Sequence, residues 1–269
     1  MKTCFNTITA GLDRRLEDIL AACGAVGFDG VELDLRHIEP ALPRLGGLDG
    51  LKALLTRHHL APVSVMAFNL APFETGTEAF DRYRRGGEVA KAIGAPMLLT
   101  YCAEAIPEGM TKEQALDVAA DRTAKLADAV APVAVTLEPI GRTALMGGPS
   151  EALEIMRRAG RENVGVMMDT FHYYRGGISD ADILAIPKDR LLIVHVNDSE
   201  DRPVEELRDG HRLHVGHGIL PLAHDMQLWK QIGYDGYLSV EIFREEYWAL
   251  PVEQVVRDTK QALDAWLKN

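Results

Sequence analysis

The chain has 269 residues, 47% of them hydrophobic, and its 29 basic and 40 acidic side chains give a formal net charge of −11. This length suffices for one large α/β barrel or for two ordinary domains, and either would bury a sizeable core. The acidic balance disfavours nucleic acid or an anionic membrane as a partner, because both would be repelled.

Three further features concern the compartment and the domain organisation. Cys4, Cys23 and Cys102 are odd in number and far apart, which is typical of reduced thiols in the cytosol. No apolar run approaches the roughly 18 residues of a membrane span, and the first residues lack the apolar centre of a signal peptide. No linker-like composition interrupts the chain. We therefore expect a soluble, cytoplasmic protein in which residues 1–269 form a single domain.

Short apolar or β-branched segments alternate with helix-like segments along the whole chain. We expect strands at residues 3–6, 30–33, 63–67, 97–101, 134–138, 164–169, 191–196 and 237–242. Most of them lack polar alternation, as is typical of parallel strands covered on both faces. The intervening helices are expected at residues 12–27, 47–60, 77–94, 111–130, 150–160, 179–186, 220–233 and 251–268.

This alternation predicts the fold. Eight strand and helix units of about 34 residues each match the roughly 250-residue size of a (β/α)8 barrel. A doubly wound open sheet is the alternative, but it usually has a G-x-G-x-x-G turn after its first strand, and none occurs here. The expected fold class is α/β, a single (β/α)8 TIM barrel.

Four polar residues stand at the ends of the last four strands, where barrel enzymes place their chemistry. Glu138 ends the fifth strand and Asp169 the sixth, while His195 and Glu241 lie near the ends of the seventh and eighth. Each residue alone could be a helix cap, a loop ion pair or a core histidine. Together they need a common counter-charge, because an uncompensated carboxylate beside an apolar core typically costs several kcal/mol.

A divalent cation would supply that counter-charge. Three carboxylates and one neutral imidazole leave room in a five- or six-coordinate shell for two neighbouring oxygens of a ligand. We expect Mn²⁺ as the cofactor, and Mg²⁺, Co²⁺ or Zn²⁺ would also suit these donors. No cysteine is placed to contribute.

Several segments resemble a known family. VTLEPIG, VGVMMDTFH, IVHVNDSEDRPVEEL and SVEIFREEYW are similar to segments of bacterial inosose (2-keto-myo-inositol) isomerases, within the wider xylose-isomerase-like group of sugar isomerases and epimerases. The resemblance covers nearly the whole chain. It implies that the metal ligands are Glu138, Asp169, His195 and Glu241, which are the four residues that strand counting selects.

The resemblance also implies substrate contacts. His172 matches the histidine of the family's D-x-x-H motif, which faces the substrate, although a histidine hydrogen-bonded within the loop is an alternative. Arg212 corresponds to a family arginine that contacts the substrate. Arg142 stands where the inosose isomerases have histidine, so we expect it to contact different substrate oxygens.

Other polar residues are weaker candidates. Asp198, three after His195, suits a carboxylate that fixes the orientation of the imidazole ring, and a loop cap is the alternative. Glu32 on the second strand faces either the barrel mouth or a neighbouring strand. The loop at residues 210–218 contains His211, His214 and His217, which could form a second metal site or be neutral loop histidines. This loop reads VGHG where the family has Pro-Gly-Glu/Gln-Gly.

The implied activity is isomerisation or epimerisation of a small polyol ketone or sugar, with inosose as the first candidate. A metal bound to two neighbouring substrate oxygens would acidify the C–H between them and stabilise an enediolate. Glu138 and Glu241 would then take a proton from one carbon and return one to the other.

Several alternatives to an inosose isomerase remain open from the sequence. They are a ketohexose 3-epimerase, a hydroxypyruvate isomerase, a dehydroshikimate-type dehydratase and a non-catalytic protein that binds polyols through its metal. An apurinic-site endonuclease would need further ligands on strands two to four, which offer mainly Glu32. Barrels of this kind often form homo-oligomers, but no helix face demands it.

Overall fold

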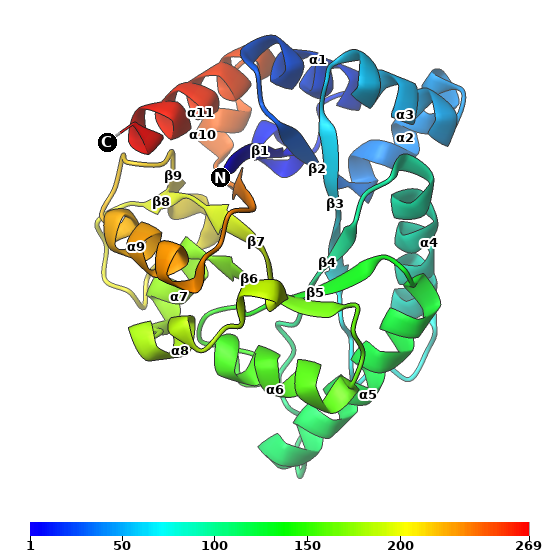
Figure 1. The fold of residues 1–269 in the computed structure, drawn as a ribbon, viewed down its shortest axis with the longest axis vertical. Coiled ribbons are helices and arrows are strands. Elements are labelled where there is room, and N and C mark those ends of the chain that lie inside the picture. Colours follow the sequence, from blue (N-terminus) through cyan, green and yellow to red (C-terminus); the bar gives the residue numbers. More distant parts are fainter. Residues whose placement is uncertain (269) are drawn as a thin grey trace.

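Eight parallel strands close into a barrel, and helices cover its outer surface (Figure 1). The computed structural model describes residues 1–268, with the side chain of Ala67 excepted. The barrel strands are β1 (Lys2–Asn6), β2 (Gly30–Asp34), β3 (Ala61–Asn69), β4 (Met97–Tyr101), β5 (Ala134–Glu138), β6 (Val164–Asp169), β7 (Leu191–Val196) and β10 (Tyr237–Val240). Each strand pairs with the next, and β10 closes the ring onto β1. The predicted (β/α)8 barrel is confirmed.

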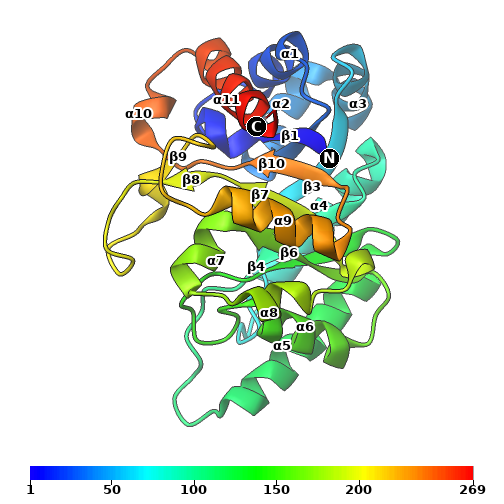
Figure 2. The ribbon, with the colours of Figure 1, turned by 60° about the vertical axis from the view of Figure 1, so that its left-hand side comes forward.

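The α-helices follow the strands in chain order. They are α1 (Leu16–Val26), α2 (Leu35–Leu45), α3 (Leu48–Arg57), α4 (Glu78–Ile93), α5 (Lys112–Val130), α6 (Pro149–Ala159), α7 (Thr170–Gly176), α8 (Asp180–Leu184), α9 (Leu222–Ile232), α10 (Glu245–Trp248) and α11 (Val252–Leu267). Helices α1 and α11 lie side by side, so the first and last helical units meet (Figure 2). Within residues 1–268, no helix has both the length and the apolar character needed to cross a membrane.

The first two strands show how the barrel sorts its side chains. Alternate residues of a strand point to opposite faces. Phe5 and Val31 pack into the large core between strands and helices, whereas Cys4 belongs to a separate apolar cluster of strand residues. Asn6 and Glu32 share the inward face with Cys4. A carboxylate on β2 therefore points into the barrel interior.

Several elements differ from the expectation, including the additional helices α2, α7 and α10. Helix α2 was not predicted, because Pro40 and Pro43 fall inside it and proline disfavours a helix interior. It forms nevertheless, since Leu35, Ile38 and Ala41 bury one face and Asp34 caps its first turn. The last barrel strand ends at Val240, earlier than expected, so that Glu241 lies just beyond it.

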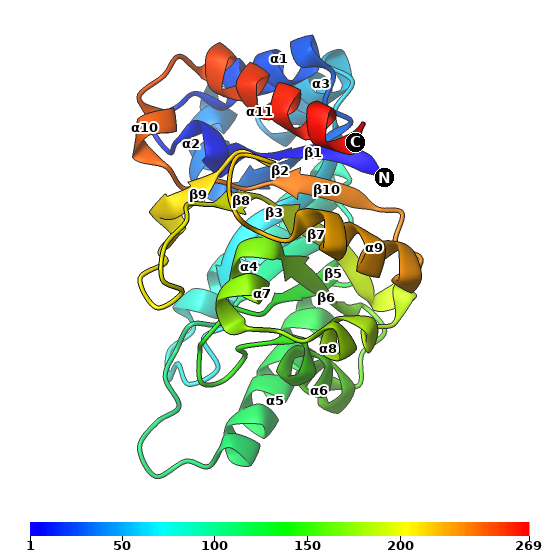
Figure 3. The ribbon, with the colours of Figure 1, turned by 90° about the vertical axis from the view of Figure 1, so that its left-hand side faces the viewer.

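The strand ends define the mouth of the barrel. The connections that follow β3, β4 and β7 all extend from the same end of the molecule (Figure 3). The connection after β7 includes a two-stranded antiparallel sheet of β8 (Asp198–Ser199) and β9 (Arg212–Leu213). Pairing with β8 brings β9, which lies near the end of this connection, back over the mouth of the barrel.

Candidate functional site

The structure brings together the four residues selected at the strand ends. One ligand atom each from Glu138, Asp169, His195 and Glu241 lies within 4.8 Å of the others. All four are buried, with exposures of 5%, 0%, 0% and 4% in that order. We call this group the four-residue cluster. Three carboxylates and an imidazole thus converge at the base of the barrel mouth.

The ring of His195 is fixed by a residue on the far side of the barrel. Its Nε2 lies 2.7 Å from Oε1 of Glu32, whose other oxygen accepts a 2.6 Å hydrogen bond from Ser64 Oγ. Its Nδ1 has no hydrogen-bond partner and lies 3.3 Å from Glu241 Oε2 and 3.7 Å from Asp169 Oδ2. With the proton on Nε2, the Nδ1 lone pair points into the cluster.

The ring contact that we expected from Asp198 is made by Glu32 instead. The Asp198 carboxylate accepts hydrogen bonds from the backbone N–H groups of Ser199 at 2.9 Å, Gly218 at 2.8 Å and Leu220 at 2.9 Å. These bonds tie the start of β8 to the returning loop. Asp198 is therefore a loop cap, which was the alternative interpretation.

The cluster concentrates negative charge in a buried place. Burial, and next the neighbouring charge of Glu241, raise the pKa of Glu138 well above its usual range. Burial is the largest effect on Asp169 and opposes its ionisation, but the positive charges of Arg212, His172 and His195 together outweigh it and lower the pKa of Asp169 to about 2. Glu138 thus lacks the close counter-charge that Arg212 supplies to Asp169.

The donor set fits a divalent cation. The unpartnered Nδ1 of His195 is directed at the carboxylates, 3.3 Å from Glu241 Oε2 and 3.7 Å from Asp169 Oδ2. Buried polar atoms without partners are rare unless a ligand satisfies them. Three oxygens and one imidazole nitrogen form a set that Mn²⁺, Mg²⁺, Co²⁺ or Zn²⁺ accepts.

Arg212 and His172, for which the resemblance implies substrate contacts, lie beside the cluster. The guanidinium of Arg212 is fully buried and donates to Asp169 Oδ2 at 2.7 Å and to Glu241 Oε2 at 3.3 Å. Its second nitrogen lies 3.1 Å from both His172 Nε2 and Asp209 Oδ1. The imidazole of His172 in turn lies 4.0 Å from Glu138 Oε1. One arginine therefore links the cluster to the wall of the mouth.

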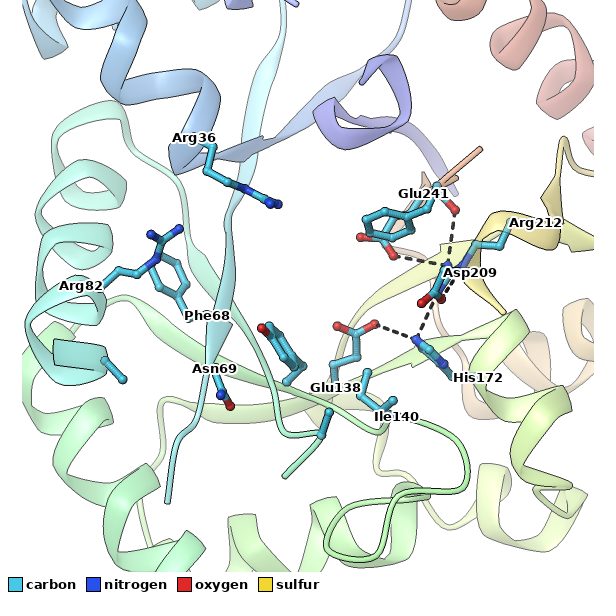
Figure 4. Close-up of a pocket in the computed structure, with 14 residues that line it drawn as sticks. Arg36, Phe68, Asn69, Arg82, Glu138, Ile140, His172, Asp209, Arg212 and Glu241 are labelled. Carbon is cyan, nitrogen blue, oxygen red and sulfur yellow. Dashed lines mark hydrogen bonds and ion pairs between the residues drawn. The ribbon is translucent and has the colours of Figure 1, made fainter. Parts of the chain in front are cut away.

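A cavity of about 550 Å³ opens above these residues. Figure 4 shows Glu138, Glu241, His172 and Arg212 on one side of it. The remaining walls combine apolar and polar side chains, among them Phe68, Asn69, Tyr101 and Ile140, with Arg36 and Arg82. Its size and mixed lining suit a small polar ligand.

Arg142 does not line this cavity, so the expected substrate contact is corrected. It is exposed and has a left-handed backbone conformation with φ of 72°. A backbone hydrogen bond of 3.0 Å from Thr143 N to Ile140 O closes a tight turn there. The turn directs the chain to a separate surface hollow, which Arg142 lines with Gly148 and Asp182.

Two buried amides near the cluster escaped the sequence-based prediction. Asn6 Nδ2 donates to Glu241 Oε1 at 2.9 Å, and Asn197 Nδ2 donates to Asp169 Oδ2 at 3.3 Å. Both follow the rule that selected the cluster, since each stands at the carboxyl end of a barrel strand. Counting polar residues of every kind at strand ends would have found them.

The histidine-rich loop does not form a second cluster. Within residues 1–268, no group of three or more potential ligands includes His211, His214 or His217. The ring of His214 stacks on Tyr247 with a centroid distance of 4.3 Å, and burial lowers its pKa to about 4. The interpretation as neutral loop histidines agrees with this packing.

The chain is similar to known proteins over nearly its whole length. The sequence pattern of the family described as "Xylose isomerase-like TIM barrel" matches residues 20–269. An inosose isomerase of Halalkalibacterium halodurans is 30% identical over 97% of this chain and 94% of that protein, and one of Bacillus subtilis is 28% identical over 97% and 96%. The solved structure of the IOLI protein with a binding zinc atom is 26% identical, with a TM-score of 0.88 over 98% of this chain and 96% of that one. The chain belongs to the xylose isomerase-like TIM-barrel family.

Proposed function

We propose that this protein is a divalent-metal-dependent isomerase or epimerase of a polyol ketone, with inosose as the first substrate to test. The observation that carries the proposal is the convergence of four ligand atoms within 4.8 Å at the base of a cavity of about 550 Å³. The similarity to proteins named inosose isomerase supports the reaction class and the choice of substrate.

In this proposal Glu138, Asp169, Glu241 and His195, through Nδ1, hold the cation. Mn²⁺ is the proposed ion, and the zinc of the similar IOLI structure makes Zn²⁺ the second choice. A bound divalent cation supplies Lewis acidity, which draws electron density from the oxygens of an α-hydroxy ketone and so acidifies the C–H between them.

The chain's own residues then move the proton. Glu138 and Glu241 face the cavity from β5 and from the end of β10, so one carboxylate can take a proton from one carbon and the other can return a proton to the next. Asn6 holds one oxygen of Glu241 at 2.9 Å and Arg212 lies 3.3 Å from the other. These contacts fix the carboxylate where proton transfer requires it.

Two further residues orient the substrate. The N–H groups of Arg212 and the imidazole of His172 border the cavity beside the cluster. The positive charge of Arg212, whose second nitrogen donates to His172 Nε2, can stabilise the negative charge that develops on substrate oxygens when the proton leaves. The burial of the cluster limits the access of bulk water to the site.

The test is proton NMR of the Mn²⁺-loaded protein in D₂O with a panel of inososes, ketohexoses and hydroxypyruvate. We expect deuterium on the carbon beside the carbonyl of the true substrate, together with its isomer. Because Glu241 is also a proposed ligand, metal content is measured alongside, and Glu241→Gln should slow the exchange by about 10² to 10⁴ per metal-loaded molecule. Glu246→Gln, at an exposed position nearby, is the matched control. Full turnover by a metal-loaded Glu241→Gln variant would contradict the acid-base assignment.

The same panel separates the alternatives. A 3-epimerase or a hydroxypyruvate isomerase would exchange deuterium into a ketohexose or hydroxypyruvate. With dehydroshikimate added to the panel, a dehydratase acting on it would produce a new carbon–carbon double bond and release water. Binding of inosose without exchange would indicate a non-catalytic polyol-binding protein. The cytoplasmic location and homo-oligomeric state stay predictions.

A further inference from the structure

Two arginines line the cavity on the wall opposite the four-residue cluster. Arg36 extends from α2 and Arg82 from α4, and both face Glu138 and Glu241 across the opening (Figure 4). The cavity therefore has the carboxylates, with Arg212 beside them, at one end and the guanidinium groups of Arg36 and Arg82 at the other.

The guanidinium group of Arg36 is held in place by Asp34, and one of its nitrogens remains available to a ligand. Its Nε donates to both oxygens of Asp34 at 3.0 and 3.1 Å, and its Nη2 donates to Oδ2 at 2.6 Å. Asp34 itself is fully buried and accepts a 2.7 Å bond from the Arg36 backbone N–H. Within the described chain, the Nη1 group makes no hydrogen bond, and the side chain is 49% exposed. A fixed guanidinium with a spare donor is arranged to bind an anion.

Arg82 differs from its neighbours on α4. Arg84 pairs with Asp81 at 3.8 Å, and Arg85 lies 3.9 Å from Glu39 and 3.5 Å from Glu88. Arg82 takes part in none of the ion pairs found within residues 1–268, although the protein has 40 acidic side chains against 29 basic ones. The cavity wall thus presents a positive charge that the protein itself does not neutralise.

A neutral polyol ketone would leave the positive charge of this wall without a counter-charge. We propose that the cavity binds a polyol ketone that carries an anionic group, a carboxylate or a phosphate, with its ketone end at the four-residue cluster and its anion between Arg36 and Arg82. The placement of the ketone end rests on the proposed function, whereas the anion site rests on the two arginines alone. Guanidinium groups form paired, charge-assisted hydrogen bonds with both kinds of anion.

The experiment compares three ketoses that differ only at carbon six. D-fructose, D-fructuronate and D-fructose 6-phosphate are titrated into the Mn²⁺-loaded protein by isothermal calorimetry. We expect at least one of the two acids to bind about tenfold more tightly than D-fructose, and the difference to shrink at high salt, because the arginine heads are partly exposed. The tighter of the two acids identifies the anionic group.

Variants locate the preference. Arg82→Gln should bind the acids and D-fructose about equally, and Arg36→Lys should reduce the preference, since lysine lacks the planar fork. Arg84→Gln, a neighbour on the same helix that does not line the cavity, should keep the full preference. Equal binding of all three ketoses by the wild type, or a preference that survives both Arg82→Gln and Arg36→Lys, would overturn the proposal. So would the absence of measurable binding by either acid.

Calorimetry tests the anion site and deuterium exchange tests the proposed reaction, and either test can fail without the other. An acid preference without exchange in any ketone would refute the proposed reaction and leave the anion site standing. Exchange in inosose together with equal binding of the three ketoses would support the reaction and refute the anion site.

Discussion

Glu32 Oε1 lies 2.7 Å from His195 Nε2, and both side chains are completely buried. The two residues belong to β2 and β7, which are not neighbours in the barrel, so the contact crosses the interior. Ser64, on β3, donates to the other oxygen of Glu32 at 2.6 Å and fixes its orientation. A carboxylate on the far wall therefore decides which ring nitrogen of His195 faces the four-residue cluster.

Replacing this carboxylate should weaken metal binding. Gln at position 32 keeps an acceptor for the ring but loses the charge that strengthens the bond, so Glu32→Gln should lower the affinity for Mn²⁺ or Zn²⁺ by about 10- to 100-fold. Titration calorimetry with the metal measures this loss. Glu253→Gln, exposed on α11, is the control. Unchanged affinity in a folded Glu32→Gln variant would show that the contact does not position the ligand.

Removing the metal should destabilise the protein. A ligand that binds only the folded state stabilises it by about 2.7 kcal/mol when its free concentration is 100 times Kd. Chelation should therefore lower the melting temperature, and added Mn²⁺ should restore it. An Asp169→Asn variant, which lacks one carboxylate of the cluster, should melt at nearly the same temperature with and without Mn²⁺. A wild-type melting temperature that chelation leaves unchanged would argue against a bound cation.

The two predicted substrate arginines should behave oppositely on substitution. Arg142 is exposed and outside the cavity, so Arg142→Ala should leave kcat and KM almost unchanged and alter stability by less than about 0.5 kcal/mol. In the metal-free protein, Arg212→Ala would remove the buried arginine that pairs with Asp169 and Glu241 and should cost about 3 to 5 kcal/mol. Urea unfolding measures both changes in stability, and steady-state kinetics measures kcat and KM. A large KM effect of Arg142→Ala would restore its expected role.

His214 should make stability depend on acidity. Burial, assisted by His217 and Arg244 and opposed by Asp258, lowers its pKa to about 4 in the folded protein, against about 6.5 when unfolded. The folded state binds this proton less readily, so the stabilising contribution is complete above pH 6.5 and is lost as the pH falls toward 4. The loss is at most about 3.4 kcal/mol. His214→Gln should lose less stability than the wild type over this interval in urea titrations.

Asp225 should act in the opposite direction. Burial raises its pKa to about 6, above the value of about 3.9 in an unfolded chain, although His224 partly opposes the shift. The free energy of unfolding therefore falls progressively as the pH rises from 4 to 6, and the loss is complete above pH 6. Asp225→Asn should stabilise the protein at pH 7 by up to about 3 kcal/mol and have little effect at pH 4. Equal effects at both pH values would contradict this assignment.

The sequence by itself determined the barrel and the four-residue cluster. Both depend on regularities that act locally: strand-sized apolar segments, helical periodicity, and polar residues where strands end. In a parallel barrel all strands end at the same mouth, so the positions of Glu138, Asp169, His195 and Glu241 along the chain already imply that they meet. The boundaries of β4 to β7 also follow from local composition.

Only the tertiary structure decided which other residues reach the site. Glu32 contacts His195 across 163 positions of sequence, which requires the closed barrel. Arg142 points away because one left-handed residue turns the chain, and Arg82 reaches the cavity only through the placement of α4. Such contacts depend on strand closure and on single backbone angles, and neither leaves a periodic signal in the sequence.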